Sequence, residues 1–118
     1  MKFKRINTLG RSYKVPVVND LDSKIWNQIK NEPKCLNMCT WKTCKTTYCR
    51  GGWAVYFAGE EGKRLLRKHS FGFAARLIYL ASTGKCPDFY TDNETARESI
   101  RRAAARERAK KRAKQNAQ

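Results

Sequence analysis

Ile100 is the last large apolar side chain of this 118-residue chain, so the residues after it have little to bury in a hydrophobic core. The same stretch contains no Gly or Pro and is rich in Ala, Arg, Lys and Glu, which are strong helix formers. Ala96 and Ile100, with Ala103 or Ala104, supply an inner face for about three turns. Because that face ends near Ala105, we expect a last helix that projects from the folded part of the chain.

Apolar residues upstream of that helix recur at helical spacing in short segments. The segments are 20–30, 51–58, 63–68 and 70–82. Pro33, the glycines at 59 and 62, and Gly84 separate them. This pattern predicts a mainly α fold, a small single-domain helical bundle of about four helices. A short N-terminal β-strand or arm fits residues 12–18, where Pro16 would restrict a strand to a sheet edge.

The distribution of charge and cysteine predicts three regions along the chain. A basic N-terminal arm covers residues 1–19, and a helical domain covers 20–104 and includes a cysteine-rich loop at 34–50. A basic helical extension follows at 105–118, and its deletion is expected to remove nucleic-acid binding while leaving the domain folded.

Local cap signals refine the expected helix ends. Asp20 or Asp22 is expected to cap the first helix. The last helix is expected to start with a capping box, in which Thr91 accepts a backbone N–H and Glu94 reaches back. Just before it, the aromatic pair at 89–90 is expected to plug the core.

The formal net charge is +16 and is concentrated at the two ends of the chain. Residues 1–14 carry five cations and no anion, and residues 97–118 carry nine cations and two glutamates. Basic ends of this kind are typical of phosphate contact with release of counterions. The candidate contacts are Lys2, Lys4, Arg5, Arg11, Arg97, Arg101, Arg102, Arg106, Arg108, Lys110, Lys111, Arg112 and Lys114. The basic ends therefore indicate nucleic acid or an acidic surface as the partner, and a solvated tail is the alternative interpretation.

On a helical wheel, the C-terminal cations form two neighbouring stripes, with Glu98 and Glu107 expected to pair with Arg102 and Lys111 at i+4. The arginine fork suits phosphate oxygens, and no Asn or Gln cluster suggests base reading. We therefore expect binding to DNA or RNA that is largely independent of sequence. Among the aromatic rings, Tyr13 and Tyr48 are the more plausible exposed ones for stacking on bases.

Four cysteines fall within one loop at spacings of four, five and five residues. They are Cys35, Cys39, Cys44 and Cys49. Four thiolates can hold a structural zinc ion, although no C-x2-C pair is present. The alternative is that these cysteines are small buried groups that position neighbouring tryptophans. The sequence leaves both interpretations open, and no other cofactor is expected.

The same loop carries an unusual run of residues. The run is Trp41-x-Thr43-Cys44-x-Thr46-Thr47-Tyr48-Cys49-Arg50-x-Gly52-Trp53. Together with segments 58–62, 77–79 and 87–90, it resembles a group of small phage and prophage proteins of no assigned function, whose pattern is W-x-T-C-x-T-T-[HY]-C-R-x-G-W. Lys42 and Tyr48 stand where that group commonly has His. The resemblance covers about residues 36–100 and implies a mobile-element origin and a mostly helical domain.

No catalytic motif is evident. The single histidine, His69, lies in a charged stretch and is expected to be solvated or near a helix cap. The adjacent Glu60 and Glu61 diverge on a helix, and no phosphate-cradling loop or nucleophile elbow is present. We therefore expect a protein that is not an enzyme. Without an apolar run or a secretory signal, it is expected to lie inside the host cytoplasm.

Two functions follow from these observations. The first is a small phage-type nucleic-acid-binding protein that contacts phosphates through its basic termini. The alternative is a phage-encoded inhibitor that binds a host protein or ribonucleoprotein complex, such as a defence nuclease or the transcription machinery. The first would bind naked nucleic acid, whereas the second needs a host protein.

Overall fold

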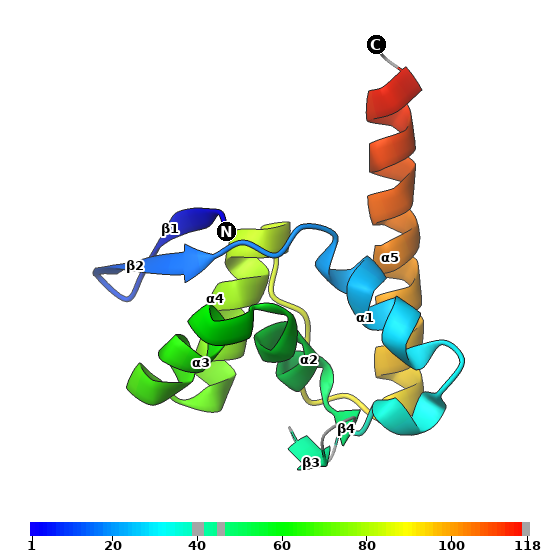
Figure 1. Ribbon diagram of the computed structural model, residues 1–118, viewed down its shortest axis with the longest axis horizontal. Helices are drawn as coiled ribbons and strands as arrows, with labels where there is room; N and C mark the ends of the chain where they lie inside the picture. The colour runs from blue at the N-terminus through cyan, green and yellow to red at the C-terminus, as the bar shows by residue number, and fades with distance from the viewer. Residues whose placement is uncertain (39–41, 45–46, 117–118) are drawn as a thin grey trace.

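The computed structural model describes residues 1–38, 42–44 and 47–116, and five α-helices dominate this part of the chain. They are α1 (Leu21–Ile29), α2 (Arg50–Phe57), α3 (Gly59–Lys68), α4 (Phe71–Thr83) and α5 (Asn93–Asn116). Figure 1 shows α2, α3 and α4 on one side of the body and α1 against α5 on the other, with the last turns of α5 projecting. The mainly helical prediction is confirmed. The described residues contain five α-helices rather than about four. Each of the four expected upstream segments forms a helix, with α3 starting at Gly59 instead of near residue 63, and the last helix is the fifth.

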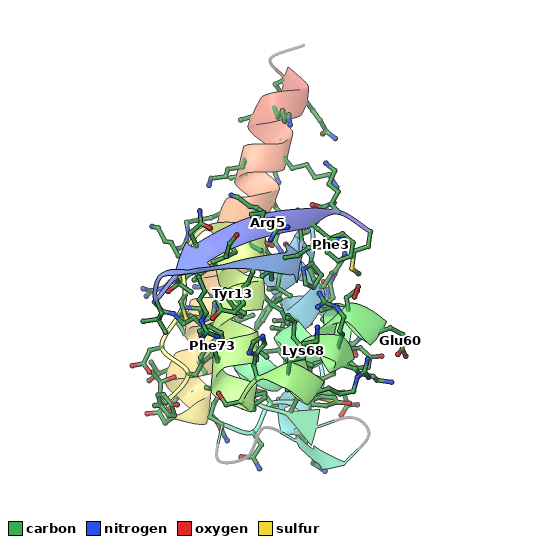
Figure 2. The ribbon with its side chains drawn as sticks, turned by 90° about the vertical axis from the view of Figure 1, so that its left-hand side faces the viewer. Phe3, Arg5, Tyr13, Glu60, Lys68 and Phe73 are labelled. Atoms are coloured by element: carbon green, nitrogen blue, oxygen red, sulfur yellow. The ribbon has the colours of Figure 1, made fainter. Side chains whose placement is uncertain are left out.

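The N-terminal residues form a β-hairpin. Strand β1 (Phe3–Thr8) pairs with β2 (Arg11–Pro16) in antiparallel register, and Pro16 is the last residue of the sheet. Both loop residues, Leu9 and Gly10, have positive φ, as a two-residue hairpin turn of type I′ requires. Val15 is fully buried, and Tyr13 packs on Phe73 of α4 with 5.3 Å between ring centroids (Figure 2). The hairpin is therefore fixed to the helical body.

Helices α1 and α5 lie antiparallel, and α5 caps both ends of α1. At the N-terminus of α1, the Glu107 carboxylate accepts hydrogen bonds from the backbone N–H groups of Asp22 (3.2 Å) and Ser23 (2.8 Å). At the C-terminus, Arg97 donates to the carbonyls of Ile29 (2.8 Å) and Lys30 (2.9 Å). Arg97 and Glu107 are ten positions apart, which corresponds to about 15 Å of helix and matches the length of a nine-residue helix, about 14 Å. The negative charge of Glu107 lies at the positive end of the α1 dipole, and the positive charge of Arg97 lies at its negative end, so both interactions are favourable.

Some of the expected caps form and others are replaced. Ser70 caps α4 by accepting from the Phe73 N–H, and Gly84 ends α4 with a φ of 82°. Asp20 occupies the N-cap position of α1, but its side chain makes no cap bond, because Glu107 fills that site.

The expected capping box on α5 is wrong. Its first-turn donor, the Thr95 N–H, binds Asp92 Oδ1 at 2.7 Å, and this bond lowers the pKa of the Asp92 carboxyl. Asp92 lies one residue closer to the helix than Thr91, whose buried hydroxyl has no hydrogen-bond partner within the described residues. The last helix therefore begins with an Asx cap.

A single hydrophobic core joins all five helices and the second strand. Leu21, Ile25 and Ile29 of α1 are fully buried, and the inner faces of α2, α4 and α5 complete the core. The expected inner face of α5 is confirmed, since Ala96, Ile100 and the alanines at 103–104 are buried. Among the described helices, none is both long enough and apolar enough to cross a lipid bilayer.

The cysteine-rich segment contains short elements rather than one unstructured loop. A 3-10 turn (Pro33–Cys35) is followed by β3 (Lys42–Cys44) and β4 (Thr47–Tyr48), which pair in antiparallel register. Cys39 lies outside the described residues.

Candidate nucleic-acid interface

The cations predicted to contact phosphate occupy different environments along α5. Arg97 is half-buried, and its guanidinium is bonded to the two carbonyls that end α1. The same group lies 5.0 Å from the ring centroid of Trp26. Its donors are used within the fold, so we assign Arg97 to the α1–α5 junction and leave it out of the proposed interface.

Arg101 and Arg102 share one carboxylate. Arg101 Nε donates to Glu98 Oε2 at 2.9 Å, and Arg102 Nε donates to Glu98 Oε1 at 3.2 Å. The hydrogen bond from Arg101, followed by that from Arg102, lowers the pKa of Glu98 to about 2. The expected Glu98–Arg102 pair is therefore confirmed.

The expected pair between Glu107 and Lys111 is wrong. Both Glu107 carboxylate oxygens face the N-terminus of α1, where Ser23 Oγ also donates to Oε1 at 2.8 Å. Lys111 Nζ instead lies 3.8 Å from Asp20 Oδ2, a half-exposed surface pair. Helix α5 therefore keeps contact with the domain as far as this turn.

Four further cations occupy the exposed end of α5 and have no ion pair within the part of the chain that the structure describes. They are Arg108, Lys110, Arg112 and Lys114. Figures 1 and 2 show these last turns extending beyond the rest of the body. At the other end of the chain, the four predicted hairpin cations, Lys2, Lys4, Arg5 and Arg11, are exposed as well. The structure thus holds both basic termini in solvent on ordered elements.

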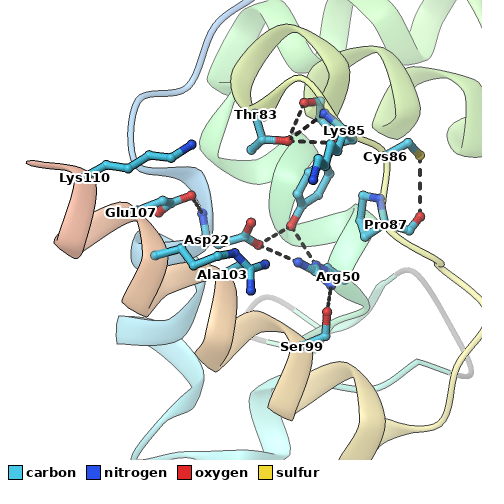
Figure 3. A pocket seen from close by; sticks show the side chains of 12 residues that line it. Asp22, Arg50, Thr83, Lys85, Cys86, Pro87, Ser99, Ala103, Glu107 and Lys110 are labelled. Atoms are coloured by element: carbon cyan, nitrogen blue, oxygen red, sulfur yellow. Dashed lines mark hydrogen bonds and ion pairs between the residues drawn. The ribbon is translucent and has the colours of Figure 1, made fainter.

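A pocket of about 350 Å³ opens between α5, the N-terminal end of α1 and the end of α4 (Figure 3). Its base is a buried polar network around Arg50, whose exposed fraction is only 4%. Arg50 donates to Asp22 Oδ1 (3.0 Å), to the Tyr79 hydroxyl (2.9 Å) and to Ser99 Oγ (2.8 Å). The Tyr79 hydroxyl donates to the same Asp22 oxygen at 2.6 Å. Burial, and then the Asp22 charge, raises the pKa of Tyr79 well above its usual value, so this donor stays protonated.

The rim of this pocket is basic. Lys85 follows α4, whereas Arg106 and Lys110 come from α5, and all three are exposed. Figure 3 shows Lys85 and Lys110 on opposite sides of the opening. The Asp22 carboxylate balances Arg50, and Glu107 faces α1, so the three rim cations set the sign of the charge presented to a ligand. We call this the α5 pocket.

The described cysteines have structural partners. Cys49 Sγ accepts from the Gly52 N–H at 3.3 Å and caps α2, while burial raises the pKa of its thiol. The Cys35 carbonyl accepts from Trp53 Nε1 at 2.8 Å. Within the described ranges, no three metal-ligating side chains form a group. Because Cys39 lies outside those ranges and the side chain of Cys44 is not described, the zinc site stays a prediction.

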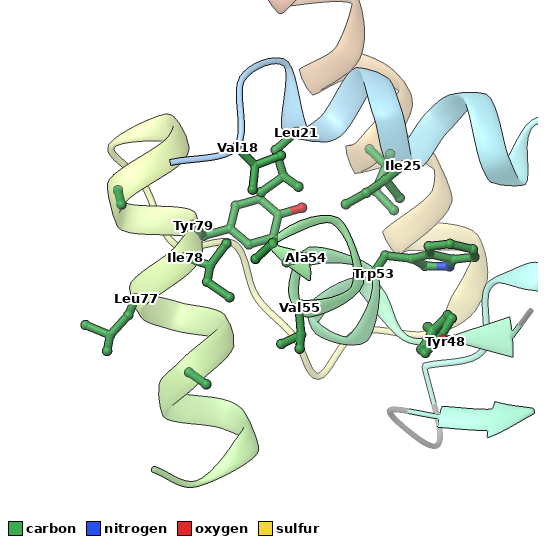
Figure 4. Close-up of a cluster of buried hydrophobic side chains, with 14 of the residues drawn as sticks. Val18, Leu21, Ile25, Tyr48, Trp53, Ala54, Val55, Leu77, Ile78 and Tyr79 are labelled. Atoms are coloured by element: carbon green, nitrogen blue, oxygen red, sulfur yellow. The ribbon is translucent and has the colours of Figure 1, made fainter. Parts of the chain in front are cut away.

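The aromatic residues differ from the expected arrangement. Tyr48 is buried and packs on Trp53, with ring centroids 4.8 Å apart (Figure 4). Of the pair expected to plug the core, Phe89 packs on Tyr79 at 5.8 Å, but Tyr90 is 90% exposed. His69 packs against Tyr13 and Phe73 at ring distances of 5.4 and 5.3 Å. Within the described residues, the side chain of His69 contacts aromatic rings, and it does not line the α5 pocket.

Comparison of the chain with protein-family descriptions, with characterised proteins and with solved structures found no match.

Proposed function

We propose that this protein binds nucleic acid, and that the exposed turns of α5 contact the phosphate backbone. The proposal is supported chiefly by one observation. The cations at 108, 110, 112 and 114, which have no ion pair within the described residues, lie on a helix that is fixed at its base and has no apolar face there. Glu107 and Arg97 hold that base in place, so the charges are presented in a fixed array. Phosphate binding by such an array depends strongly on salt and only weakly on sequence.

The test compares two triple variants that lose the same charge. The first is R108Q, R112Q and K114Q on α5, and the matched control is K34Q, R67Q and K68Q elsewhere on the surface. All six positions are exposed and outside the α1–α5 junction. Fluorescence anisotropy with a labelled oligonucleotide would give the affinity between about 0.05 and 0.2 M salt, the range in which phosphate contacts dominate.

The α5 triple variant should bind at least about tenfold more weakly near 0.1 M salt, and its salt slope should shrink by about 2 to 3. The control should retain most of the affinity of the unmodified protein. Equal losses in the two variants would mean that only net charge matters. No affinity for any oligonucleotide, or a response that does not change with salt, would reject the proposal.

The alternative function, a phage-encoded inhibitor of a host complex, predicts a different result in binding experiments. The protein would then retain a host protein from lysate after nuclease treatment, and it would bind naked oligonucleotide weakly. A nuclease-controlled pull-down beside the anisotropy measurement therefore distinguishes the two functions.

A further inference from the structure

A second pocket adjoins the α5 pocket. It has a volume of about 320 Å³, and its lining includes Arg76 of α4 and the aromatic pair Phe89 and Tyr90. The two pockets share Cys86 and Pro87, so the segment between α4 and α5 forms the wall between them. We call the second one the Tyr90 pocket. A ligand that extends past this wall would contact the basic rim and the tyrosine together.

Tyr90 is held out from the body by its surroundings. Its backbone N–H donates to Asp88 Oδ1 at 2.8 Å, which fixes the turn, and Phe89 is anchored on the buried Tyr79. Gly72 is a neighbour of this tyrosine, because a Cβ added there would lie 3.9 Å from the Tyr90 hydroxyl. As a glycine, it has no side chain that could cover the ring. A tyrosine ring that is 90% exposed therefore stands beside a concave surface with its area available for contact.

The two pockets together combine cations with an aromatic surface. Arg76 is exposed and lies close enough to the Cys86 thiol to lower its pKa, although burial has the larger, opposite effect. This places a guanidinium at the shared wall, in addition to the rim cations of the α5 pocket. Backbone-tracking cations next to an exposed aromatic ring are the arrangement by which proteins hold single strands.

We infer that the ligand is single-stranded nucleic acid, with a phosphate against the rim of the α5 pocket and an adjacent base stacked on Tyr90. This inference rests on the proposed function and specifies its substrate. In a duplex, the faces of internal bases are covered by their neighbours, so none is available to a tyrosine ring. In a single strand, any base offers its face, and DNA and RNA share the required chemistry.

The experiment measures binding of one labelled 12-nucleotide sequence as single-stranded DNA, as single-stranded RNA and as a DNA duplex. Four variants are compared with the unmodified protein: Y90A, Y90F, R106Q and Y56A. Tyr56 is an exposed tyrosine outside both pockets and serves as the matched control. A thermal melt of each variant confirms that it is folded.

We expect a single strand to bind more tightly than the duplex. Y90A should lose about 5- to 150-fold in single-strand affinity, the range that base stacking contributes, and it should change duplex affinity little. Y90F should keep the affinity, because stacking needs the ring and not the hydroxyl. R106Q should reduce the single-strand salt slope by about 0.7, and Y56A should resemble the unmodified protein.

An abasic strand gives an independent measure of stacking. The unmodified protein should bind it as weakly as Y90A binds the normal strand, and Y90A should not distinguish the two strands. If Y90A binds normally, or if duplex and single strand bind equally, the inference is overturned while nucleic-acid binding through α5 stands. If no oligonucleotide binds, or if the α5 triple variant described above binds as well as the unmodified protein, the proposed function itself fails.

Discussion

The capping of α1 by a side chain from the far end of the chain leads to a stability prediction for E107A. The Glu107 carboxylate satisfies two backbone N–H groups and the Ser23 hydroxyl, at 3.2, 2.8 and 2.8 Å. Alanine removes all three bonds and leaves the first turn of a nine-residue helix to water. Asp20, at the N-cap position, does not replace them, because its backbone is left-handed and its side chain makes no cap bond.

The expected cost follows from the types of interaction lost. An N-cap is worth about 1 kcal/mol, its charge near the helix N-terminus adds about 0.3–1 kcal/mol, and a hydrogen bond to a charged group is worth about 1.5–3 kcal/mol. These contributions overlap, so we expect E107A to destabilise the protein by about 2 kcal/mol. For a domain of this size, that corresponds to a decrease in Tm of about 8 °C. E107Q retains one acceptor oxygen without the charge and should cost about half as much.

Urea denaturation and thermal melts would measure these differences, with E60A as the control. Glu60 is also a glutamate in an ion pair, with Lys63 at 3.4 Å, but its side chain is 85% exposed. Its removal should cost less than about 0.5 kcal/mol. Hydrogen exchange at the Asp22 and Ser23 amides should accelerate in E107A and not in E60A. If E107A and E60A are equally stable, the cap does not contribute and the antiparallel α1–α5 arrangement has to be reconsidered.

Three further predictions concern the buried network, a close packing contact and the dependence of stability on pH. R50A should destabilise the protein by about 3–5 kcal/mol in urea denaturation, because it leaves a buried carboxylate without its cation. G62A should destabilise it by about 1–3 kcal/mol by the same assay, since the added Cβ would lie 2.5 Å from the Val55 carbonyl oxygen. The folded pKa of Glu98 is depressed from its ordinary 4.5 to about 2, chiefly by Arg101, so its stabilising contribution is present above pH 4.5 and is lost as the pH falls toward 2. Carboxyl NMR titration of Glu98 should show this low midpoint, and R101Q should raise it.

Local signals were sufficient to predict most helix boundaries. Ser70 and Gly84 bracket α4 as expected, because a hydroxyl cap and a left-handed glycine act within a few residues of the helix. The inner face of α5 was also predictable, since its alanines and Ile100 recur at helical spacing. These features depend only on neighbours in the sequence, which is why composition and spacing find them.

The parts that could not be predicted depend on contacts between distant segments. Arg50 lies in a run of Cys, Thr and Gly that favours a loop, yet it is buried because Asp22 and Tyr79, from other helices, neutralise and bond it. The α5 pocket exists only once α1, α4 and α5 are packed. Tyr90 was expected inside because aromatic residues are usually buried, and its exposure depends on the turn at Asp88 and on the absence of a side chain at Gly72.

The structure changes how the role of the C-terminal helix should be tested. A deletion of residues 105–118 removes the exposed cations, but it also removes Glu107 and with it the cap on α1. Lost binding in that deletion would therefore report unfolding as well as lost phosphate contacts. The boundary between the part of α5 that stabilises the domain and the part proposed to bind phosphates falls just beyond Glu107. The glutamine variants at 108, 112 and 114 lie beyond this boundary and leave the cap on α1 intact.

Glu107 also explains how an anion is accommodated on a helix proposed to bind phosphates. It lies one turn before Lys110 and Lys111, where an exposed carboxylate would repel a polyanion and weaken the neighbouring cations. Because both of its oxygens face the N–H groups at the start of α1, its charge is directed toward the positive end of a helix dipole. The same contact thus fixes the base of α5 and leaves its outer surface basic. E107A should therefore lower stability without increasing nucleic-acid affinity. If the carboxylate faced outward instead, E107A would leave stability unchanged and increase nucleic-acid affinity.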